Sequence, residues 1–318
     1  MRILITGATG YLGGRIARHL AERGHAVTGL GLVLPAGADS WRASLADLIQ
    51  GDIRDDRVLD RAASAQPEVV IHTVSLDHRA SEPLSPDVFS VNVQPVHDLG
   101  ARLAGLRTRF VYLSTAQVYG PFPLEDISET RPPAPANAYA LTHLMAEEVG
   151  AMIARRSALR WVVLRLSNAC GAPVFADCNC WWLVVNDFCR SALRRGRIEL
   201  QSDGAPQRDF VSIRDVCRAA ETVSLVPEDR LAFDCYNVGG GRTLTMLELA
   251  HKVAEAVRVA TGQRVPVLLP GGIEAATAGA PATGPRFRYL IERIRALGWE
   301  PVGGIDEGVR EVLAFLRR

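Results

Sequence analysis

The sequence predicts an α/β fold, in which a doubly wound parallel sheet is accompanied by a smaller C-terminal α/β domain. Three observations support this prediction. Short apolar runs alternate with helix-period segments through the first half, a glycine-rich turn follows the first run, and the pattern changes after residue 168. Alternating strands and helices form βαβ units, and helices then cover both faces of the resulting parallel sheet.

The first half of the chain supplies the elements of the predicted sheet. Strands are expected at 2–6, 26–30, 68–74, 109–114 and 161–166, and helices at 13–23, 55–65, 86–106 and 139–156. Between two of these elements, residues 119–137 contain five prolines. Proline lacks an amide proton and breaks both helices and central strands, so an irregular loop is expected there.

The second half is less regular. We expect a helix at 182–195 and strands at 209–212 and 235–238, while Thr245 and Glu248 form a capping box that opens a helix to about residue 257. The Gly-, Ala-, Pro- and Thr-rich segment 270–285 is expected to be a mobile loop. Two short helical patterns surround residues 297–299. The predicted first domain spans 1–167 with a returning segment at about 211–244, and the second spans 168–210 and 245–318.

Composition narrows the class of partner. The 318 residues carry 36 basic and 35 acidic side chains, so a net charge of +1 gives no electrostatic reason to expect nucleic acid or an anionic membrane as partner. No apolar run approaches the ~20 residues that span a bilayer, and the first apolar run leads into glycines rather than a cleavage site. The six cysteines are too sparse for a disulfide scaffold and show no zinc-ligand spacing. We therefore expect a cytoplasmic protein with reduced thiols and no metal.

The glycine-rich turn is the first chemical motif. Gly7, Gly10 and Gly13 follow the first strand at three-residue spacing and open the first helix. Glycines at such a turn let a pyrophosphate approach the backbone, and the helix N-terminus offers it free N–H groups. The sequence therefore predicts a Rossmann-like dinucleotide site. Its expected contacts in this turn are Gly7, Thr9, Gly10, Tyr11, Leu12 and Gly13.

The spacing of this turn and several later motifs resemble the extended short-chain dehydrogenase/reductases, which include sugar-nucleotide epimerases and dehydratases. Segments 51–55, 70–74, 113–120, 164–171, 208–211, 236–239 and 297–299 are similar to the family's landmarks, in the same order, and cover nearly the whole chain. The resemblance implies further cofactor contacts from Asp52, Ile53, Thr73, Val74 and Asn92.

The same resemblance implies the catalytic residues. Tyr139 matches the family's proton-transferring tyrosine, and Thr115 matches the hydroxyl that binds the same substrate oxygen. Four residues after the tyrosine, where the family has a lysine that binds the nicotinamide ribose, this chain has His143. A fixed charge ~5 Å from the phenol, at an effective dielectric constant near 20, is worth roughly 3 kcal/mol, or about 2 pKa units. Histidine at pH 7 supplies less of this stabilisation.

Three interpretations of this change remain open. His143 could contact the cofactor and partly assist Tyr139, the proton chemistry could belong to another residue, or the protein could bind a nucleotide without catalysis. The only lysine in the chain, Lys252, belongs to the predicted second domain and is not expected at this site. A second departure concerns the end of the second strand, where Gly31 replaces the family's ribose-binding acid and no arginine follows until Arg42. NAD is the expected cofactor, with NADP as the alternative.

The expected reaction is 4-epimerisation of a nucleotide sugar. Dehydratases of the family carry an Asp-Glu pair after the active-site threonine, whereas this chain has Ala116 and Gln117. An NAD(P)H-dependent ketoreductase is the alternative enzyme. Substrate contacts are expected from Ser75, Thr115, Gln117, Asn168, Cys178 and Arg208. Cys178 is either a carbon-acid base, as in some 3,5-epimerases, or an ordinary loop thiol. The helices at 86–106 and 139–156 resemble the pair through which the family forms homodimers.

Overall fold

The structure is a computed structural model that describes residues 1–121, 125–275 and 286–318. Its centre is a seven-stranded parallel sheet with the strand order β11-β7-β5-β4-β1-β2-β3. The strands are β1 (Arg2–Thr6), β2 (Ala26–Gly31), β3 (Asp47–Gln50), β4 (Val69–His72), β5 (Arg109–Thr115), β7 (Arg160–Leu166) and β11 (Cys235–Val238). The chain leaves β1 toward one edge and then returns past it toward the other. This order confirms the doubly wound sheet.

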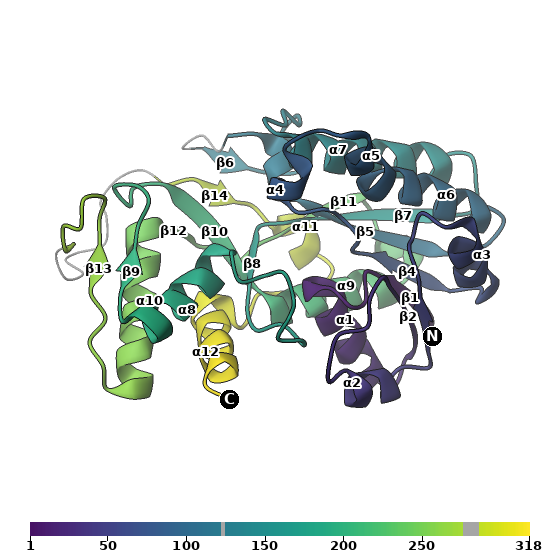
Figure 1. The fold of residues 1–318 in the computed structure, drawn as a ribbon. Coiled ribbons are helices and arrows are strands. Elements are labelled where there is room, and N and C mark those ends of the chain that lie inside the picture. Colours follow the sequence, from purple (N-terminus) through teal and green to yellow (C-terminus); the bar gives the residue numbers. More distant parts are fainter. Residues whose placement is uncertain (122–124, 276–285) are drawn as a thin grey trace.

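Helices cover both faces of this sheet (Figure 1). On one face lie α3 (Asp56–Ser64), α4 (His78–Ser81), α5 (Pro86–Asn92), α6 (Gln94–Leu103) and α7 (Ala138–Ala154); on the other lie α1 (Tyr11–Glu22), α2 (Asp39–Ala43) and α9 (Ile213–Leu225). The inner strands β1, β4, β5 and β7 are buried on both sides and are correspondingly rich in Val, Ile and Leu.

The predicted helix at 86–106 is wrong in one respect, because it is two helices. α5 ends at Asn92 and α6 begins at Gln94, with Val93 at φ −118° between them. Pro95 explains the break, since its ring lacks an N–H and clashes with the carbonyl four residues earlier in a continuous helix. Proline is tolerated in the first turn of α6, where an N–H would have no partner inside the helix.

A second, smaller group of elements lies beside the sheet (Figure 1). It contains α8 (Val184–Arg195), α10 (Met246–Thr261), α12 (Gly304–Leu316), the three-stranded sheet of β8 (Asn168–Cys170), β10 (Gln207–Ser212) and β12 (Thr243–Thr245), and the pair β9 (Ile198–Glu199) and β13 (Val267–Leu268). These elements share their own apolar core. The capping box of Thr245 and Glu248 is confirmed at the start of α10.

Segments that return from later parts of the chain connect the two groups of elements. The predicted irregular loop contains the short strand β6 (Asp126–Ile127), which pairs with β14 (Arg288–Tyr289). Further along the chain, α11 (Glu292–Arg295) packs on β11. The aromatic side chains of Phe287, Tyr289 and Trp299 belong to the core of the large sheet. The two-domain division remains a proposal. It assigns residues 287–299 to the second domain, although these aromatic side chains pack in the core of the large sheet. The mobile loop expected at 270–285 lies, from residue 276 on, outside the described residues.

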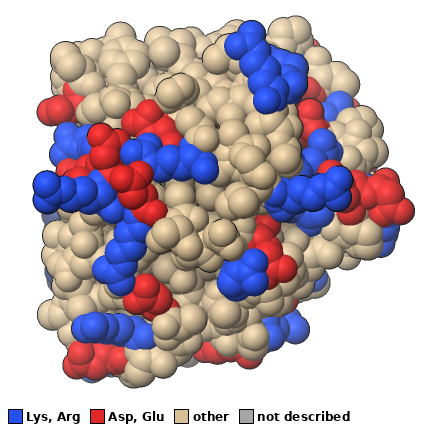
Figure 2. All heavy atoms as spheres, turned by 90° about the vertical axis from the view of Figure 1, so that its right-hand side faces the viewer, with Lys and Arg blue, Asp and Glu red and all other residues tan. Residues whose placement is uncertain are grey.

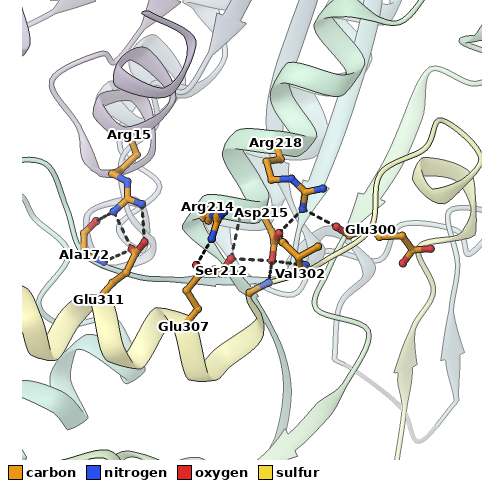
Figure 3. A network of polar contacts seen from close by, with 11 residues as sticks. Arg15, Ala172, Ser212, Arg214, Asp215, Arg218, Glu300, Val302, Glu307 and Glu311 are labelled. Carbon is orange, nitrogen blue, oxygen red and sulfur yellow. Dashed lines mark hydrogen bonds and ion pairs between the residues drawn. The ribbon is translucent and has the colours of Figure 1, made fainter. Parts of the chain in front are cut away.

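A polar network anchors the C-terminal helix to the sheet domain (Figure 3). Arg15 of α1 forms paired hydrogen bonds of 2.9 and 3.0 Å with Glu311 of α12. Asp215, which is fully buried in α9, accepts hydrogen bonds from Ser212 and from the backbone amides of Val302 and Gly303. Because these bonds join α1, α9 and α12, they hold the second group of elements against the sheet.

The surface around α3 and α6 carries charges of both signs. Arginines and acidic residues alternate on this face (Figure 2), and Arg102 of α6 pairs with both Asp56 and Asp60 of α3. Among the described helices, none combines the length and apolarity needed to cross a membrane.

Candidate active site

The predicted catalytic residues gather at the carboxyl end of the parallel sheet. The glycine-rich turn follows β1, Thr73 follows β4, and Thr115 ends β5. These three strands are neighbours in the order β5-β4-β1. Carboxyl ends of adjacent parallel strands lie along one edge, and ligands of open α/β sheets bind at that edge.

The glycine-rich turn has a backbone that only small residues permit. Gly7 has a φ of +72°, and a Cβ at Gly13 would lie 2.1 Å from the Gly7 carbonyl oxygen. Helix α1 starts directly after Gly10, without a side-chain cap and without an acidic residue in its first turn. The first N–H groups of α1 are therefore open to an anion, which fits the pyrophosphate of a dinucleotide.

Tyr139 and Thr115 lie together, as the sequence predicts. Asn137 caps α7 by accepting a hydrogen bond from Ala140, so Tyr139 lies in the first turn of that helix. Burial, together with the negative charge of Asp77, raises the pKa of Tyr139 to about 12, while a hydrogen bond with the Thr115 side chain acts in the opposite direction. The phenol is therefore protonated at neutral pH.

His143 lies one turn after Tyr139 on the same face of α7. The two rings meet edge to face with their centroids 4.4 Å apart. Nδ1 of His143 lies 2.8 Å from the Tyr112 hydroxyl, and Nε2 lies 3.2 Å from Ser75 Oγ. Burial, together with the neighbouring His72, lowers the pKa of His143 to about 3. The imidazole is therefore neutral and supplies no positive charge to Tyr139.

The loop after β4 is ordered by Asn92. Asn92 is fully buried: its Oδ1 accepts from the Leu76 backbone amide at 2.7 Å, and its Nδ2 donates to Thr142 Oγ1 at 3.0 Å. Both contacts are with protein groups. Asn92 thus fixes Ser75 and Asp77 relative to α7, and its predicted contact with the cofactor stays a prediction.

Three other residues predicted to contact the cofactor have side chains that are hydrogen-bonded within the protein. The Tyr11 hydroxyl donates to the Gly171 carbonyl at 2.9 Å, so only its backbone N–H faces the open helix end. Both carboxylate oxygens of Asp52 accept hydrogen bonds from Arg54, and these bonds lower the pKa of Asp52. Thr73 donates to the Thr6 carbonyl. The remaining predicted contacts, Thr9, Leu12, Ile53 and Val74, stay predictions.

Gly31, at the end of β2, has no room for a side chain. A Cβ there would lie 2.5 Å from Thr9 Oγ1 and 2.6 Å from Thr9 Cγ2. The space that a ribose-binding acid would enter is therefore occupied by Thr9. This contact accounts for glycine at the position where the resemblance implies an acid.

The predicted substrate residues lie on β8 and β10 of the second group, at the end of β5, in the short helix that follows β5, and in two loops. Asn168 and Arg208 lie on the paired strands β8 and β10, and the Asn168 amide donates to the Asp209 carbonyl at 2.9 Å. Gln117 accepts from the Asn137 side chain at 3.1 Å, which places it beside the start of α7. The buried Cys178 thiol hydrogen-bonds with Cys180, and that bond lowers its pKa. This arrangement is compatible with an ordinary loop thiol.

Sequence reasoning missed a bridge over the loop beside Tyr139. Asn179 donates to Asp77 Oδ2 at 2.7 Å, and the Trp182 indole donates to Asn179 at 3.0 Å. The bridge joins the loop after β4 to the loop before α8. The contact partners are 102 residues apart, so no local pattern could have revealed them.

Among the described residues, the cysteines and the other possible metal ligands form no second functional site. All six cysteines are free thiols. In the part of the chain that the structure describes, no three His, Cys, Asp or Glu side chains are grouped so as to hold a metal ion. The single lysine, Lys252 of α10, pairs with Asp306 of α12 and lies in the smaller group of elements.

The fold and this site define a dinucleotide-binding enzyme of the extended short-chain dehydrogenase/reductase type. The sequence pattern of the NAD dependent epimerase/dehydratase family matches residues 3–239, and the chain belongs to that family. NAD is accordingly its cofactor. The glycine turn and the open N-terminus of α1 fit this group.

Known relatives cover the full length of the chain. The low-salt glycan biosynthesis protein Agl12 of Haloferax volcanii is 28% identical over 99% of this chain and 98% of its own. UDP-glucose 4-epimerase of Mycolicibacterium smegmatis is 27% identical over 100% and 99%. The solved Thermus thermophilus UDP-glucose 4-epimerase complex with NAD is 26% identical, with a TM-score of 0.81 over 100% of this chain and 99% of that one. Other relatives are dTDP-glucose 4,6-dehydratases.

Proposed function

We propose that this chain is a 4-epimerase of a nucleotide sugar. The observation that carries the proposal is the contact of Tyr139 with Thr115 at the sheet edge that also carries the glycine turn, with Ala116 and Gln117 following the threonine. Ala116 is buried and apolar, and Gln117 is bonded to Asn137. Neither side chain can supply the acid–base pair that elimination of water from a sugar requires. The reaction that these side chains still permit is proton transfer at a single sugar hydroxyl.

The residues divide the chemistry between them. The turn of Gly7, Gly10 and Gly13 would hold the NAD pyrophosphate, and bound NAD supplies a hydride acceptor that can return the hydride. Tyr139 removes the proton of a sugar hydroxyl and later gives it back, and Thr115 orients the phenol by its hydrogen bond. Ser75 and Gln117, on the loops beside Tyr139, would contact the sugar. Asn168 and Arg208, from the second sheet, would contact the nucleotide part.

A retained cofactor distinguishes this reaction from net reduction. An epimerase restores its cofactor in every cycle, so the nucleotide can stay bound through purification and need not exchange. We expect mass spectrometry of molecules released by denaturing the purified protein to find about one NAD per chain. Release of no dinucleotide, together with binding of added NADPH, would argue against the proposal.

One observation favours a ketoreductase as the second candidate. With Tyr139 protonated and His143 neutral, the site is better prepared to donate a proton than to accept one. Reduction of a carbonyl needs a donor at this position. Consumption of NADPH in proportion to a reduced sugar product would favour this candidate, because an epimerase consumes none.

Asp77 is expected to set the pH dependence of turnover. Its charge raises the pKa of Tyr139, so Asp77→Asn should lower that pKa and move the rising limb of the rate–pH profile to lower pH. The rate at pH 7 should rise by about a few-fold. Asparagine still caps α4. Asp55→Asn, a matched change at the cap of α3, should leave the profile in place. An unchanged profile in Asp77→Asn would contradict a basic role for Tyr139.

We also propose that two copies pair through α5, α6 and α7. Helices α6 and α7 pack side by side (Figure 1), and α7 is apolar around most of its circumference, with Met152 42% exposed. A helix apolar on its outer side indicates a further partner, and a two-fold axis would set this face against the same face of a second copy.

Light scattering during gel filtration tests this pairing. We expect a mass twice the 34.5 kDa of one chain. Met152→Glu should yield monomers, since it places a charge in the paired face. Val259→Glu, on the exposed side of α10, is the matched control and should remain a dimer. A monomeric wild-type chain would contradict the proposal.

A further inference from the structure

The hydrogen bonds around His143 determine which ring nitrogen carries its proton. Ser75 Oγ has one proton, and it donates this proton to the Leu76 carbonyl at 2.8 Å. Toward His143, Ser75 can then only accept. Nε2 then donates to Ser75 over 3.2 Å, a longer contact than the 2.8 Å between Nδ1 and the Tyr112 hydroxyl.

The other nitrogen is fixed by Tyr112. A neutral imidazole with a proton on Nε2 has an unprotonated Nδ1, which can only accept. The Tyr112 hydroxyl lies 2.8 Å from it and donates. Tyr112 is able to remain a donor because burial raises its pKa well above the ordinary value, and the negative charge of Glu147 acts in the same direction.

The surroundings hold Tyr112 in this place. Its ring is buried in β5 and stacks with His72 of β4 on one side and Trp161 of β7 on the other, with centroids 5.8 and 5.7 Å apart. Gly150 of α7 makes room for this row, since a Cβ there would lie 2.2 Å from the Trp161 ring. These ring contacts hold the Tyr112 hydroxyl in a fixed position relative to His143.

We propose that Tyr112 is a positioning residue that fixes His143 as the neutral tautomer with its proton on Nε2. His143 then donates a directed hydrogen bond to Ser75, a predicted substrate contact, at the place where the resembling enzymes offer a charge. Tyr112 touches neither substrate nor cofactor and acts through His143. The catalytic part of this inference rests on the proposed function, whereas the tautomer does not.

Nitrogen NMR of the ¹⁵N-histidine-labelled protein at pH 7 tests the tautomer directly. The His143 signals, assigned with the His143→Gln variant, should show a protonated Nε2 and an unprotonated Nδ1. Tyr112→Phe should replace this pattern by a mixture of tautomers or by the opposite one. Tyr236→Phe is the matched control, because it also removes a buried hydroxyl, one that contacts Phe233 instead. Its His143 signals should match those of the wild type.

Two results would overturn the inference: a wild-type His143 protonated on Nδ1, or a Tyr112→Phe variant with unchanged His143 signals. A kinetic measurement tests the catalytic part of the inference. Tyr112→Phe should lower kcat by about tenfold, the effect of one lost hydrogen bond, with KM within about twofold. A wild-type chain without epimerase turnover would refute the proposed function and leave the NMR result to decide the role of Tyr112.

Discussion

Replacing Tyr139 with phenylalanine is expected to lower kcat by about 10²- to 10⁴-fold, because the phenol is the proton-transferring group of the site. The variant loses one oxygen and keeps the ring that packs edge to face on His143. NAD binding should therefore persist. Steady-state kinetics and calorimetric titration with NAD measure the two properties separately.

Tyr236→Phe supplies the control for this loss, since Tyr236 is equally aromatic and lies in β11 away from the glycine turn. Its kcat should equal that of the wild type. A Tyr139→Phe variant that keeps more than about a tenth of the activity would move the proton chemistry to another residue. That outcome corresponds to the second interpretation of the change from lysine to His143.

Breaking the ion pair of Glu147 and Arg165 is expected to cost about 3–5 kcal/mol of the free energy of unfolding. Both side chains are buried, Arg165 Nη2 lies 2.6 Å from Glu147 Oε2, and Ser114 donates to the same carboxylate. In Arg165→Leu the carboxylate loses its charged partner and stays in the interior. Urea unfolding of the variant and the wild type measures the difference.

The double variant Glu147→Leu/Arg165→Leu distinguishes loss of the pair from loss of packing. Removing both charges leaves no unpaired ion, so the double variant should be more stable than Arg165→Leu alone. If the two changes are additive, the pair contributes no coupling, and the cost belongs to the packing of Arg165 on the Tyr119 ring.

The strands and the glycine turn could be predicted because their signals are local. Buried parallel strands form short apolar runs, and Gly7 and Gly13 reveal a turn whose backbone leaves no room for larger residues. The break between α5 and α6 was also within reach, since Pro95 is visible in the sequence. The apolar pattern nevertheless continues across Pro95 from 86 to 106, and such a pattern predicts one long helix.

The state of His143 could be predicted only in part. The four-residue spacing places it on the face of Tyr139, as the structure shows. Its neutrality depends on burial and on the neighbouring His72, and the hydrogen bond at its Nδ1 comes from Tyr112 of β5, which is 31 residues away. Tyr112 and Ser114 alternate along β5 and both face α7, a period-two pattern that could have drawn attention to Tyr112.

The contact between Asn179 and Asp77 shows the same limitation. The chain between them includes β5 and β7 of the large sheet, and only the folded arrangement sets the two loops side by side. The electrostatic effect of Asp77 on Tyr139 therefore required the structure.

Interconversion of two sugar epimers without added cofactor is the most direct test of the proposed function. Purified protein would be incubated separately with UDP-glucose and UDP-galactose, and with the corresponding dTDP sugars, and followed by proton NMR. The proposal predicts that, for the base accepted, both sugars reach the same final ratio while no reduced cofactor accumulates. If all four sugars remain unchanged and the protein instead consumes NADPH with a keto-sugar, the chain is a reductase and the proposal is wrong.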